Sequence, residues 1–212
     1  MELSTCSPLP DGKMESSDYV RLSLAAAMTL GFVKGWFYRN AKLGCINLLL
    51  TYADGCKAHC AFCGLAGEKE RRASGGSFIR VPWRIFPTDA VVEAVKSAPS
   101  HVSRVCISMI THPRSRRDVL HICRRVALET GKSVSLLISP SVLHRDDLQA
   151  MKDAGADRIG VAVDGATKPI FDKLRGRPVR GPHSWERYWK TYEQSLYVFG
   201  QGMAGVHLIC GL

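Results

Sequence analysis

The sequence CINLLLTYADGCKAHCAFCG, from Cys45 to Gly64, joins a continuous apolar run to a loop that carries three cysteines, Cys56, Cys60 and Cys63. A continuous run such as CINLLLTY (45–52) is typical of a strand that is covered on both faces, as the strands of parallel sheets are. The cysteine loop begins where this strand ends. Because α/β barrels keep their chemistry at the carboxyl ends of their strands, the position of the loop predicts a functional site.

Four more apolar runs follow along the chain, and amphipathic segments separate them. The runs cover residues 104–110, 133–139, 158–163 and 205–212, and the helical candidates cover residues 88–98, 115–130, 145–155 and 184–199. The alternation of strand and helix predicts a parallel sheet, and the spacing of the runs favours barrel units over hairpins. We therefore predict an α/β fold, a partial (β/α)6 TIM-like barrel of which five strands are visible.

The two ends of the chain differ from the barrel pattern. Residues 1–43 are predicted to form an N-terminal extension to a barrel of residues 44–212; the run LSLAAAMTLGFV (22–33) predicts a helix that packs across the outside or bottom of the barrel. The last apolar strand ends at Gly211 and Leu212 with no helix after it. Because a domain rarely ends on a buried strand, we expect the barrel to be truncated after the fifth strand, with a longer protein or another chain completing the sheet.

Composition and charge limit the class of protein. With 212 residues, 46% of them hydrophobic, the chain can bury a sizeable core. The apolar run at 22–33 is too short to span a bilayer, and the polar segment before it is unlike the basic start of a signal peptide, so we expect a cytoplasmic protein without a membrane partner. The net charge of +10 suits an anionic cofactor, an acidic protein partner or RNA. Nucleic acid is disfavoured because no interleaved aromatic and basic motif is present.

Eight cysteines are too few and too unevenly spaced for a secreted disulfide scaffold; they stand at positions 6, 45, 56, 60, 63, 106, 123 and 210. Cys106 and Cys210 lie within apolar runs and Cys123 within a helical pattern, so these three are expected to be structural. Cys6 and Cys45 stay unassigned. The tight cluster that remains predicts a metal site.

Zinc and iron are the alternatives at this cluster. A structural zinc ion takes four protein ligands, and His59 is poorly placed as the fourth because it directly precedes Cys60. A four-iron cluster bound by three cysteines leaves one iron open, where a substrate or cofactor can coordinate. Stoichiometry and the position of the loop therefore favour an iron-sulfur cluster.

The pattern Cys-x-x-x-Cys-x-aromatic-Cys, filled by Cys56, Cys60, Phe62 and Cys63, resembles the signature of the radical S-adenosylmethionine (SAM) superfamily. The resemblance covers about residues 44–212. It implies that the three cysteines hold a [4Fe-4S] cluster whose open iron is chelated by SAM, and it places Phe62 near the adenine. The resemblance further implies that an electron donor reduces the cluster and that SAM is then cleaved to a 5′-deoxyadenosyl radical. This radical would abstract a hydrogen atom from a substrate.

The same resemblance suggests further cofactor-binding residues. Where the family often has a Gly-Gly-Glu-like segment that binds the methionine amine, this chain offers Thr111 or His112. The stretch VAVDGATKPIFDKLRG (161–176) resembles a family segment that implies Asp164 for the ribose hydroxyls and Arg175 for the SAM carboxylate. A turn residue and a solvated loop cation are the alternatives for these two positions.

The longer run GWFYRNAKLGCINLLLTYADGCKAHCAFCGLA (35–66) resembles one of the two radical SAM proteins of the alternative, two-protein lipoyl synthase, in a group close to biotin synthase. It implies sulfur insertion into an octanoyl chain on an acidic carrier protein, in lipoate biosynthesis, with a second radical SAM protein as partner. No second compact cysteine motif is visible for a sacrificial cluster. A radical SAM enzyme that acts in another cofactor pathway or modifies RNA or a peptide, and a non-catalytic zinc or iron-sulfur protein, are the alternatives.

Overall fold

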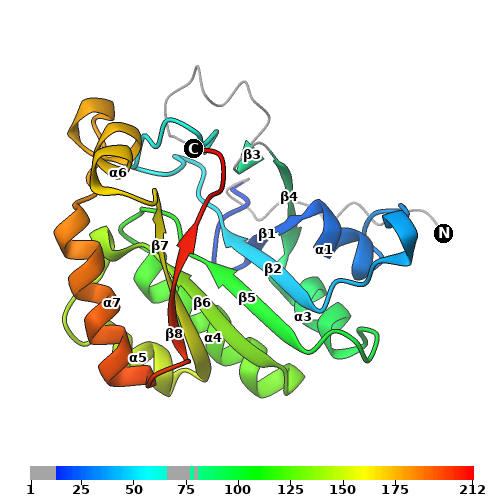
Figure 1. Ribbon diagram of the computed structural model, residues 1–212. Helices are drawn as coiled ribbons and strands as arrows, with labels where there is room; N and C mark the ends of the chain where they lie inside the picture. The colour runs from blue at the N-terminus through cyan, green and yellow to red at the C-terminus, as the bar shows by residue number, and fades with distance from the viewer. Residues whose placement is uncertain (1–12, 66–76, 79–80) are drawn as a thin grey trace.

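One eight-stranded sheet organises the described residues, 13–65, 77–78 and 81–212, of this computed structural model. Its strands are β1 (Tyr19–Ser23), β2 (Cys45–Leu50), β3 (Ser77–Phe78), β4 (Val81–Pro87), β5 (Arg104–Ser108), β6 (Ser133–Ile138), β7 (Ala156–Asp164) and β8 (Ala204–Leu208). The helices are α1 (Leu24–Thr29), α3 (Thr88–Lys96), α4 (Ser115–Thr130), α5 (Asp147–Asp153), α6 (Lys168–Arg175) and α7 (Trp185–Phe199), with short 3-10 helices η1 (Tyr38–Asn40), η2 (Pro140–Val142) and η3 (Arg177–Val179). The strand order is β3-β4-β1-β2-β5-β6-β7-β8 (Figure 1).

Five neighbouring strands, β2, β5, β6, β7 and β8, run parallel to one another. Helices connect them in sequence: α3 precedes β5, α4 follows β5, α5 follows β6, and α6 and α7 follow β7. The predicted α/β fold with five parallel barrel strands is confirmed, and α4 coincides with the predicted helix at 115–130.

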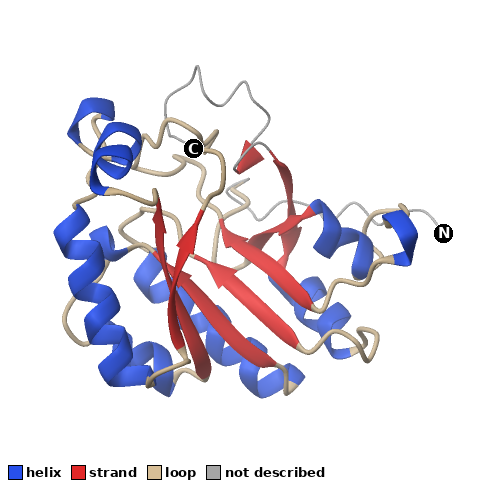
Figure 2. Cartoon of the chain, in the orientation of Figure 1, coloured by secondary structure: helices blue, strands red, loops and turns tan. Residues whose placement is uncertain are grey.

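The core lies between the parallel strands and the helices α4, α5 and α7, which flank them on one face (Figure 2). Ile46 and Leu48 on β2 and Ile122 on α4 have no exposed surface and belong to one cluster. The α4 helix ends at Gly131, which takes a φ of 63° and donates its N–H to the carbonyl of Ala127. Glycine adopts this left-handed cap without steric cost, so the chain can turn at once into β6.

The N-terminal segment differs from its prediction. Instead of a helix from Leu22, the chain forms β1, which pairs antiparallel with both β2 and β4, and α1 starts only after Ser23. Val20 and Leu22 are fully buried, while Arg21 points the other way and donates to Thr51 Oγ1 at 3.1 Å. This alternation makes the segment a strand of the main sheet, so the expectation that it covers the barrel from outside is wrong for residues 19–23.

Two smaller features of the fold were also not predicted. The antiparallel strand β4 lies beside β1, and the eight-residue helix α6 follows β7. Cys6 and the rest of residues 1–12 lie outside the described part of the chain. Within the described residues, every helix is too short or too polar to cross a membrane.

The carboxyl ends of the parallel strands define one end of the sheet. The loop after β2 and the helix α6 both lie at this end (Figure 1), and the backbone N–H of Ala61 in the loop donates to the carbonyl of Leu174 in α6 at 2.9 Å. The cysteine loop is therefore held where barrel enzymes place their chemistry.

Candidate active site

Backbone hydrogen bonds close the cysteine loop upon itself. Gly55, with a φ of 70°, makes the turn after β2, and the N–H of Cys56 donates to the carbonyl of Leu65 at 2.9 Å. Inside this closure the N–H of Cys63 donates to the carbonyl of Cys60 at 3.0 Å. The spacing of the three cysteines is thus fixed by a compact backbone arrangement.

The loop is also tied to the strand ends on either side of it. The N–H of Lys57 donates to the carbonyl of Thr111 after β5 at 2.7 Å, and on the far side Ala61 bonds to Leu174, as described above. These two contacts span the ends of the parallel strands. A cavity lies between the loop and the strand ends as a result.

This cavity, called the cysteine pocket below, has a volume of about 50 Å³. The residues that line it come from the loop, the strand ends and the segments that follow them: Cys56, Ala58, Cys60, Phe62, Cys63, Leu65, Met109, Ile110, Thr111, Leu137, Ser139, Ala162, Asp164, Arg175 and His183. All three cysteines, Phe62, Thr111, Asp164 and Arg175, each predicted from the sequence, are therefore brought to one pocket. His112, also predicted, is not among the lining residues.

The local environment sets the protonation of the thiols. Burial raises the pKa of Cys56 and of Cys60 above the ordinary value of 9.0. Hydrogen bonds to Cys56 from Ala58 and Thr111 oppose the effect of burial there, and the guanidinium of Arg175, which contacts Cys60, opposes it at that thiol. A cysteine that binds a metal loses its proton, so these donors would stabilise the ligated thiolates.

Asp164 and Arg175 form a buried ion pair at the edge of the pocket. Arg175 Nη1 lies 2.9 Å from Asp164 Oδ2, and the two side chains are 6% and 9% exposed. The same nitrogen donates to the carbonyls of Ala162 and Val163. Burial lowers the pKa of Arg175, but the combined effect of Tyr188, Asp164 and Cys60 is larger and raises the pKa above its ordinary value. The guanidinium therefore stays charged.

Asp164 is held by an unusual backbone conformation. Its φ is 62°, and the pairing of β7 with β8 shifts register between Ala162 and Asp164. The next residue is Gly165, where a Cβ atom would lie 2.9 Å from the backbone nitrogen of Phe171. This close approach brings the start of α6 against the end of β7, which carries Arg175 back toward Asp164.

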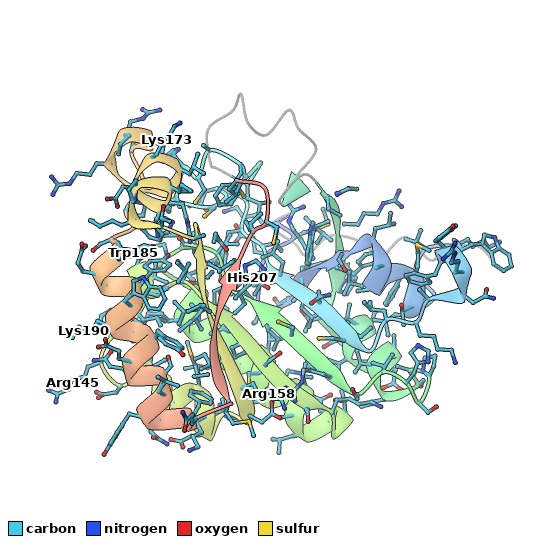
Figure 3. The ribbon with its side chains drawn as sticks, in the orientation of Figure 1. Arg145, Arg158, Lys173, Trp185, Lys190 and His207 are labelled. Carbon is cyan, nitrogen blue, oxygen red and sulfur yellow. The ribbon has the colours of Figure 1, made fainter. Side chains whose placement is uncertain are left out.

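His207, which the sequence analysis missed, completes this group of side chains. Its Nδ1 lies 2.8 Å from Asp164 Oδ1, and its side chain is 41% exposed on β8, where Figure 3 labels it. A signal was present in the sequence, because His207 is the one polar side chain in the apolar run GVHLICGL (205–212). A polar residue within an otherwise apolar run indicates a site on one face of the sheet.

His112 has a structural environment of its own. Its ring stacks on Tyr52 with centroids 3.8 Å apart, and its Nε2 lies 3.1 Å from Asp54 Oδ1. Its Nδ1 accepts a hydrogen bond from the N–H of Arg114. Burial lowers the pKa of His112 even though Asp54 opposes that effect. These contacts direct the imidazole toward the start of the cysteine loop, away from the cysteine pocket.

A second cavity, the inner-face cavity, follows the face of the sheet that the helices do not cover. It has a volume of about 540 Å³ and is lined by Ser23, Asn47, Val81, Trp83, Cys106, Ser108, Ser135, Leu136, Leu137, Arg158, Ile159, Gly160, Gly205, Val206 and His207. Arg158, near the start of β7, and His207, near the end of β8, are labelled in Figure 3. Leu137 lines both cavities, and the His207–Asp164 hydrogen bond joins them.

The remaining described cysteines differ from one another. Cys123 is fully buried and burial raises its pKa to about 12, in agreement with a structural role. Cys106 lines the inner-face cavity. Burial, with a smaller contribution from the nearby thiol of Cys106, raises the pKa of Cys45 to about 11. Cys210 is exposed in the turn after β8, so the structure does not support the structural role that was expected of it.

Comparison with known proteins identifies the class to which this fold and site correspond. The family model described as the radical SAM superfamily matches residues 50–196, a range that holds the cysteine loop, Asp164 and Arg175. The match covers more than half of the chain. The chain belongs to the radical SAM superfamily.

Several curated relatives are similar at low identity. The AdoMet-dependent heme synthase of Methanosarcina barkeri is 27% identical over 124 residues, which cover 58% of this chain and 32% of the relative. Biotin synthase 2 of Polaromonas sp. is 22% identical over 167 residues, covering 78% and 43%. The PqqA peptide cyclase of Rhodopseudomonas palustris is 24% identical over 135 residues, covering 62% and 32%. The chain thus spans less than half of the length of each of these relatives.

A solved structure supports the fold. The crystal structure of methylornithine synthase (PylB) matches with a TM-score of 0.51 and 14% sequence identity, and the match covers 86% of this chain and 48% of that chain. At this identity the likeness concerns the fold, and it agrees with the parallel strand order described above.

The family implies a [4Fe-4S] cluster and SAM, and the chemistry of the residues that line the cysteine pocket suits both groups. Three thiols border one cavity, and two buried nitrogen atoms in its lining, Arg175 Nε and His183 Nε2, have no hydrogen-bond partner among the described residues. Such donors suit a polar ligand with acceptor groups. No three His, Cys, Asp or Glu side chains of the described residues are grouped around a single metal position, whereas in a four-iron cluster each cysteine binds a different iron.

Proposed function

We propose that this chain cleaves SAM reductively at a [4Fe-4S] cluster bound by Cys56, Cys60 and Cys63, and that it directs the resulting radical to abstract a hydrogen atom from a substrate. One observation carries the proposal. The three cysteines line a single pocket at the carboxyl ends of the parallel strands, together with the buried Asp164–Arg175 pair. Membership of the radical SAM superfamily supports the same chemistry.

The residues of the pocket have distinct proposed roles. Cys56, Cys60 and Cys63 would hold the cluster, which when bound and reduced would supply the electron for cleavage of SAM. Phe62 packs near the adenine, Asp164 accepts hydrogen bonds from ribose hydroxyls, and Arg175 neutralises the carboxylate. Thr111, which contacts Cys56 and whose Oγ1 lies 3.0 Å from Ser139 Oγ, is the candidate for the methionine amine. His112 lies outside the pocket, and we do not propose it for this role.

The inner-face cavity is the proposed binding site of the substrate. It opens beside the cysteine pocket at Leu137 and His207. Its lining contains several apolar side chains, which include Val81, Leu136 and Ile159. An apolar lining with a few polar groups suits an acyl chain. This lining supports a more specific proposal, that the chain inserts sulfur into an octanoyl chain in lipoate biosynthesis. The basic chain would bind an acidic carrier protein that holds the octanoyl group. A second radical SAM protein would act beside it.

A reducing compartment is part of the proposal. No disulfide joins any two of the described cysteines. Thiols persist in a reducing cytosol, so the cytoplasm is the proposed location, with a cytosolic electron donor as partner.

The first experiment is anaerobic reconstitution with iron and sulfide, reduction with dithionite and addition of SAM. We expect 5′-deoxyadenosine to form, and octanoylated carrier protein then becomes the first substrate to test for sulfur incorporation. Iron binding without nucleoside formation would contradict the catalytic proposal, and failure to bind iron would contradict the cluster assignment. Nucleoside formation without any reaction on the octanoyl chain would contradict only the lipoate proposal and direct the search to RNA or peptide substrates.

A further inference from the structure

His183 is a buried polar residue of the cysteine pocket that the proposed mechanism does not yet use. It lies between η3 and α7, is 6% exposed and lines the pocket together with Thr111 and Arg175. Its Nδ1 lies 2.8 Å from the hydroxyl of Tyr188 and 2.7 Å from Ser141 Oγ. Its Nε2 has no partner among the described residues and is shielded from solvent.

The surroundings determine which nitrogen of His183 carries the proton. Burial, with a smaller contribution from the charge of Arg175, lowers its pKa to about 3, so the ring is neutral at physiological pH. A neutral imidazole has one donor and one acceptor nitrogen. The hydroxyls of Tyr188 and Ser141 can each donate a proton to Nδ1. With Nδ1 as the acceptor, the ring proton lies on Nε2, and we adopt this tautomer, in which Nε2–H is the donor.

A chain of hydrogen bonds fixes the position of this donor. Tyr188 is fully buried, and its hydroxyl lies 3.4 Å from Ser139 Oγ and accepts from Arg175 Nη2 at 3.4 Å. Ser139 in turn contacts Thr111. His183 is thereby linked to three other residues of the pocket lining, Ser139, Thr111 and Arg175. A ring held in this way is preorganised, which reduces the entropy lost when a ligand binds.

Two unpartnered donors border the same pocket: the neutral Nε2–H of His183 and the charged Nε–H of Arg175. A buried donor without an acceptor is costly, and a native fold keeps such a group chiefly where a ligand or water satisfies it. The pair is one cation and one neutral donor, so an anionic acceptor matches it best. SAM offers one anionic group, its α-carboxylate.

We propose that His183 is a SAM-binding residue whose Nε2–H donates to the α-carboxylate of the cofactor beside Arg175, with Tyr188 and Ser141 as the positioning residues that hold the ring. The inference rests on the proposed function, because it names a contact within the same SAM site. It adds an uncharged N–H donor for the SAM carboxylate. This donor comes from the segment before α7, far in sequence from the cysteine loop.

The test compares ligands with and without the carboxylate. SAM and decarboxylated SAM are titrated by calorimetry into the reconstituted, unreduced wild-type protein and into His183→Phe, which keeps a ring without an N–H. Loss of one charge-assisted hydrogen bond is expected to weaken SAM binding by about 10- to 100-fold. Decarboxylated SAM should bind both proteins with similar affinity, because it lacks the acceptor.

Controls separate this contact from a general loss of structure. His183→Gln places an amide N–H near the position of Nε2 and should recover most of the SAM affinity, while His121→Phe, at an exposed position of α4, should bind like wild type. If His183→Phe lowers the affinity for the two ligands by the same factor, or does not lower it, the inference is overturned. If wild type itself binds neither ligand, both this inference and the proposed function are overturned.

A second measurement needs no variant. Nitrogen-15 spectra of histidine-labelled wild-type chain report the tautomer of each imidazole. We expect His183 at pH 7 to be neutral with its proton on Nε2. A proton on Nδ1, or a charged ring, would overturn the assignment of His183 as the donor while leaving the radical SAM proposal intact.

Discussion

Among single residues, Cys60 is the cysteine of the loop with the least exposed surface. It is 8% exposed and contacts the guanidinium of Arg175. Because three thiolates are needed to hold a cluster with one open iron, the loss of this ligand should prevent stable binding. The backbone hydrogen bonds that close the loop do not depend on its sulfur.

Replacing Cys60 with Ala is therefore expected to abolish [4Fe-4S] binding without unfolding the chain. Iron analysis and the visible absorbance after reconstitution measure the first effect, and circular dichroism measures the second. Cys210→Ala, at an exposed position after β8, is the matched control and should keep a full iron content. A Cys60→Ala protein that retains all of its iron would disprove the assignment.

Burial of His183 also predicts a pH dependence of stability. Its pKa is lowered from 6.5 to about 3 in the folded state, so between these values the unfolded chain binds more protons than the folded chain. The free energy of unfolding is therefore unaffected by the titration of His183 above pH 6.5. As the pH falls from 6.5 toward 3, His183 lowers the free energy of unfolding by up to about 1.4 kcal/mol per pH unit.

Urea unfolding between pH 7 and 4.5 measures this dependence. His183→Gln, which does not titrate, should show a shallower loss of stability than wild type, and His121→Gln should match wild type. Equal slopes in wild type and in His183→Gln would show that His183 is not buried in its neutral form.

Sequence patterns predicted much of the site but not all of it. The cysteine spacing and the 161–176 stretch led to residues that the structure places around one pocket, although their roles stay predictions. His112 was predicted to bind SAM because it is next to Thr111 in the sequence. Adjacency in sequence does not show that Thr111 lines the pocket while the side chain of His112 points elsewhere. His183 and His207 join the site through contacts with residues 42 and 43 positions away in the sequence, which no local pattern reveals.

At the scale of elements, the turn between α6 and α7 is the most closely packed part of the site. A Cβ atom on Gly181 would lie 1.8 Å from the carbonyl oxygen of Arg175, which is backbone and cannot rotate away. The N–H of Gly181 donates to the carbonyl of Gly176 at 2.9 Å. The same turn leads directly to His183, so its path positions residues on both helices.

Gly181→Ala is expected to force this turn apart. We expect a loss of about 1–3 kcal/mol in the free energy of unfolding, as for other overpacked sites, and weaker SAM binding because Arg175 and His183 shift together. Thermal unfolding and calorimetry measure the two effects. Gly205→Ala on β8, where no atom lies within 4 Å of the added Cβ, is the control for stability. Equal melting temperatures for the two variants would contradict the clash.

Elements with strong local signals were predicted accurately, and those that depend on distant partners were not. The helix at 115–130 has its own amphipathic pattern and a glycine cap, so its bounds were readable from sequence. By contrast, β1 is a strand because β2 and β4 pair with it from both sides. Its apolar residues continue into α1 without a break, and a helical pattern was the simpler interpretation of the whole run.

For the whole molecule, β1 makes the N-terminal segment part of the central sheet. Leu22 on β1 is 0% exposed and belongs to the main core cluster. Its neighbour Leu24, the first residue of α1, is 39% exposed. The two leucines are therefore a matched pair that measures how far the segment contributes to global stability.

Leu22→Ala is expected to lower the free energy of unfolding by about 2–5 kcal/mol, as for other buried leucines, while Leu24→Ala should change it by less than about 0.5 kcal/mol. Urea titration of both variants supplies the numbers. Similar small effects for the two variants would indicate that residues 19–23 form an independent extension and that the rest of the fold does not need them.

The hydrogen bond between His207 and Asp164 has a thermodynamic consequence for the molecule as a whole. His207 lines the inner-face cavity, and Asp164 lines the cysteine pocket. A ligand that displaces one partner removes a hydrogen bond from the other, so this contact is expected to couple the occupancies of the two cavities. Linkage makes this coupling reciprocal, so each ligand must change the equilibrium affinity of the other by the same factor. The size of that factor, and its loss in a His207→Phe protein, would measure the cooperativity that one 2.8 Å contact provides.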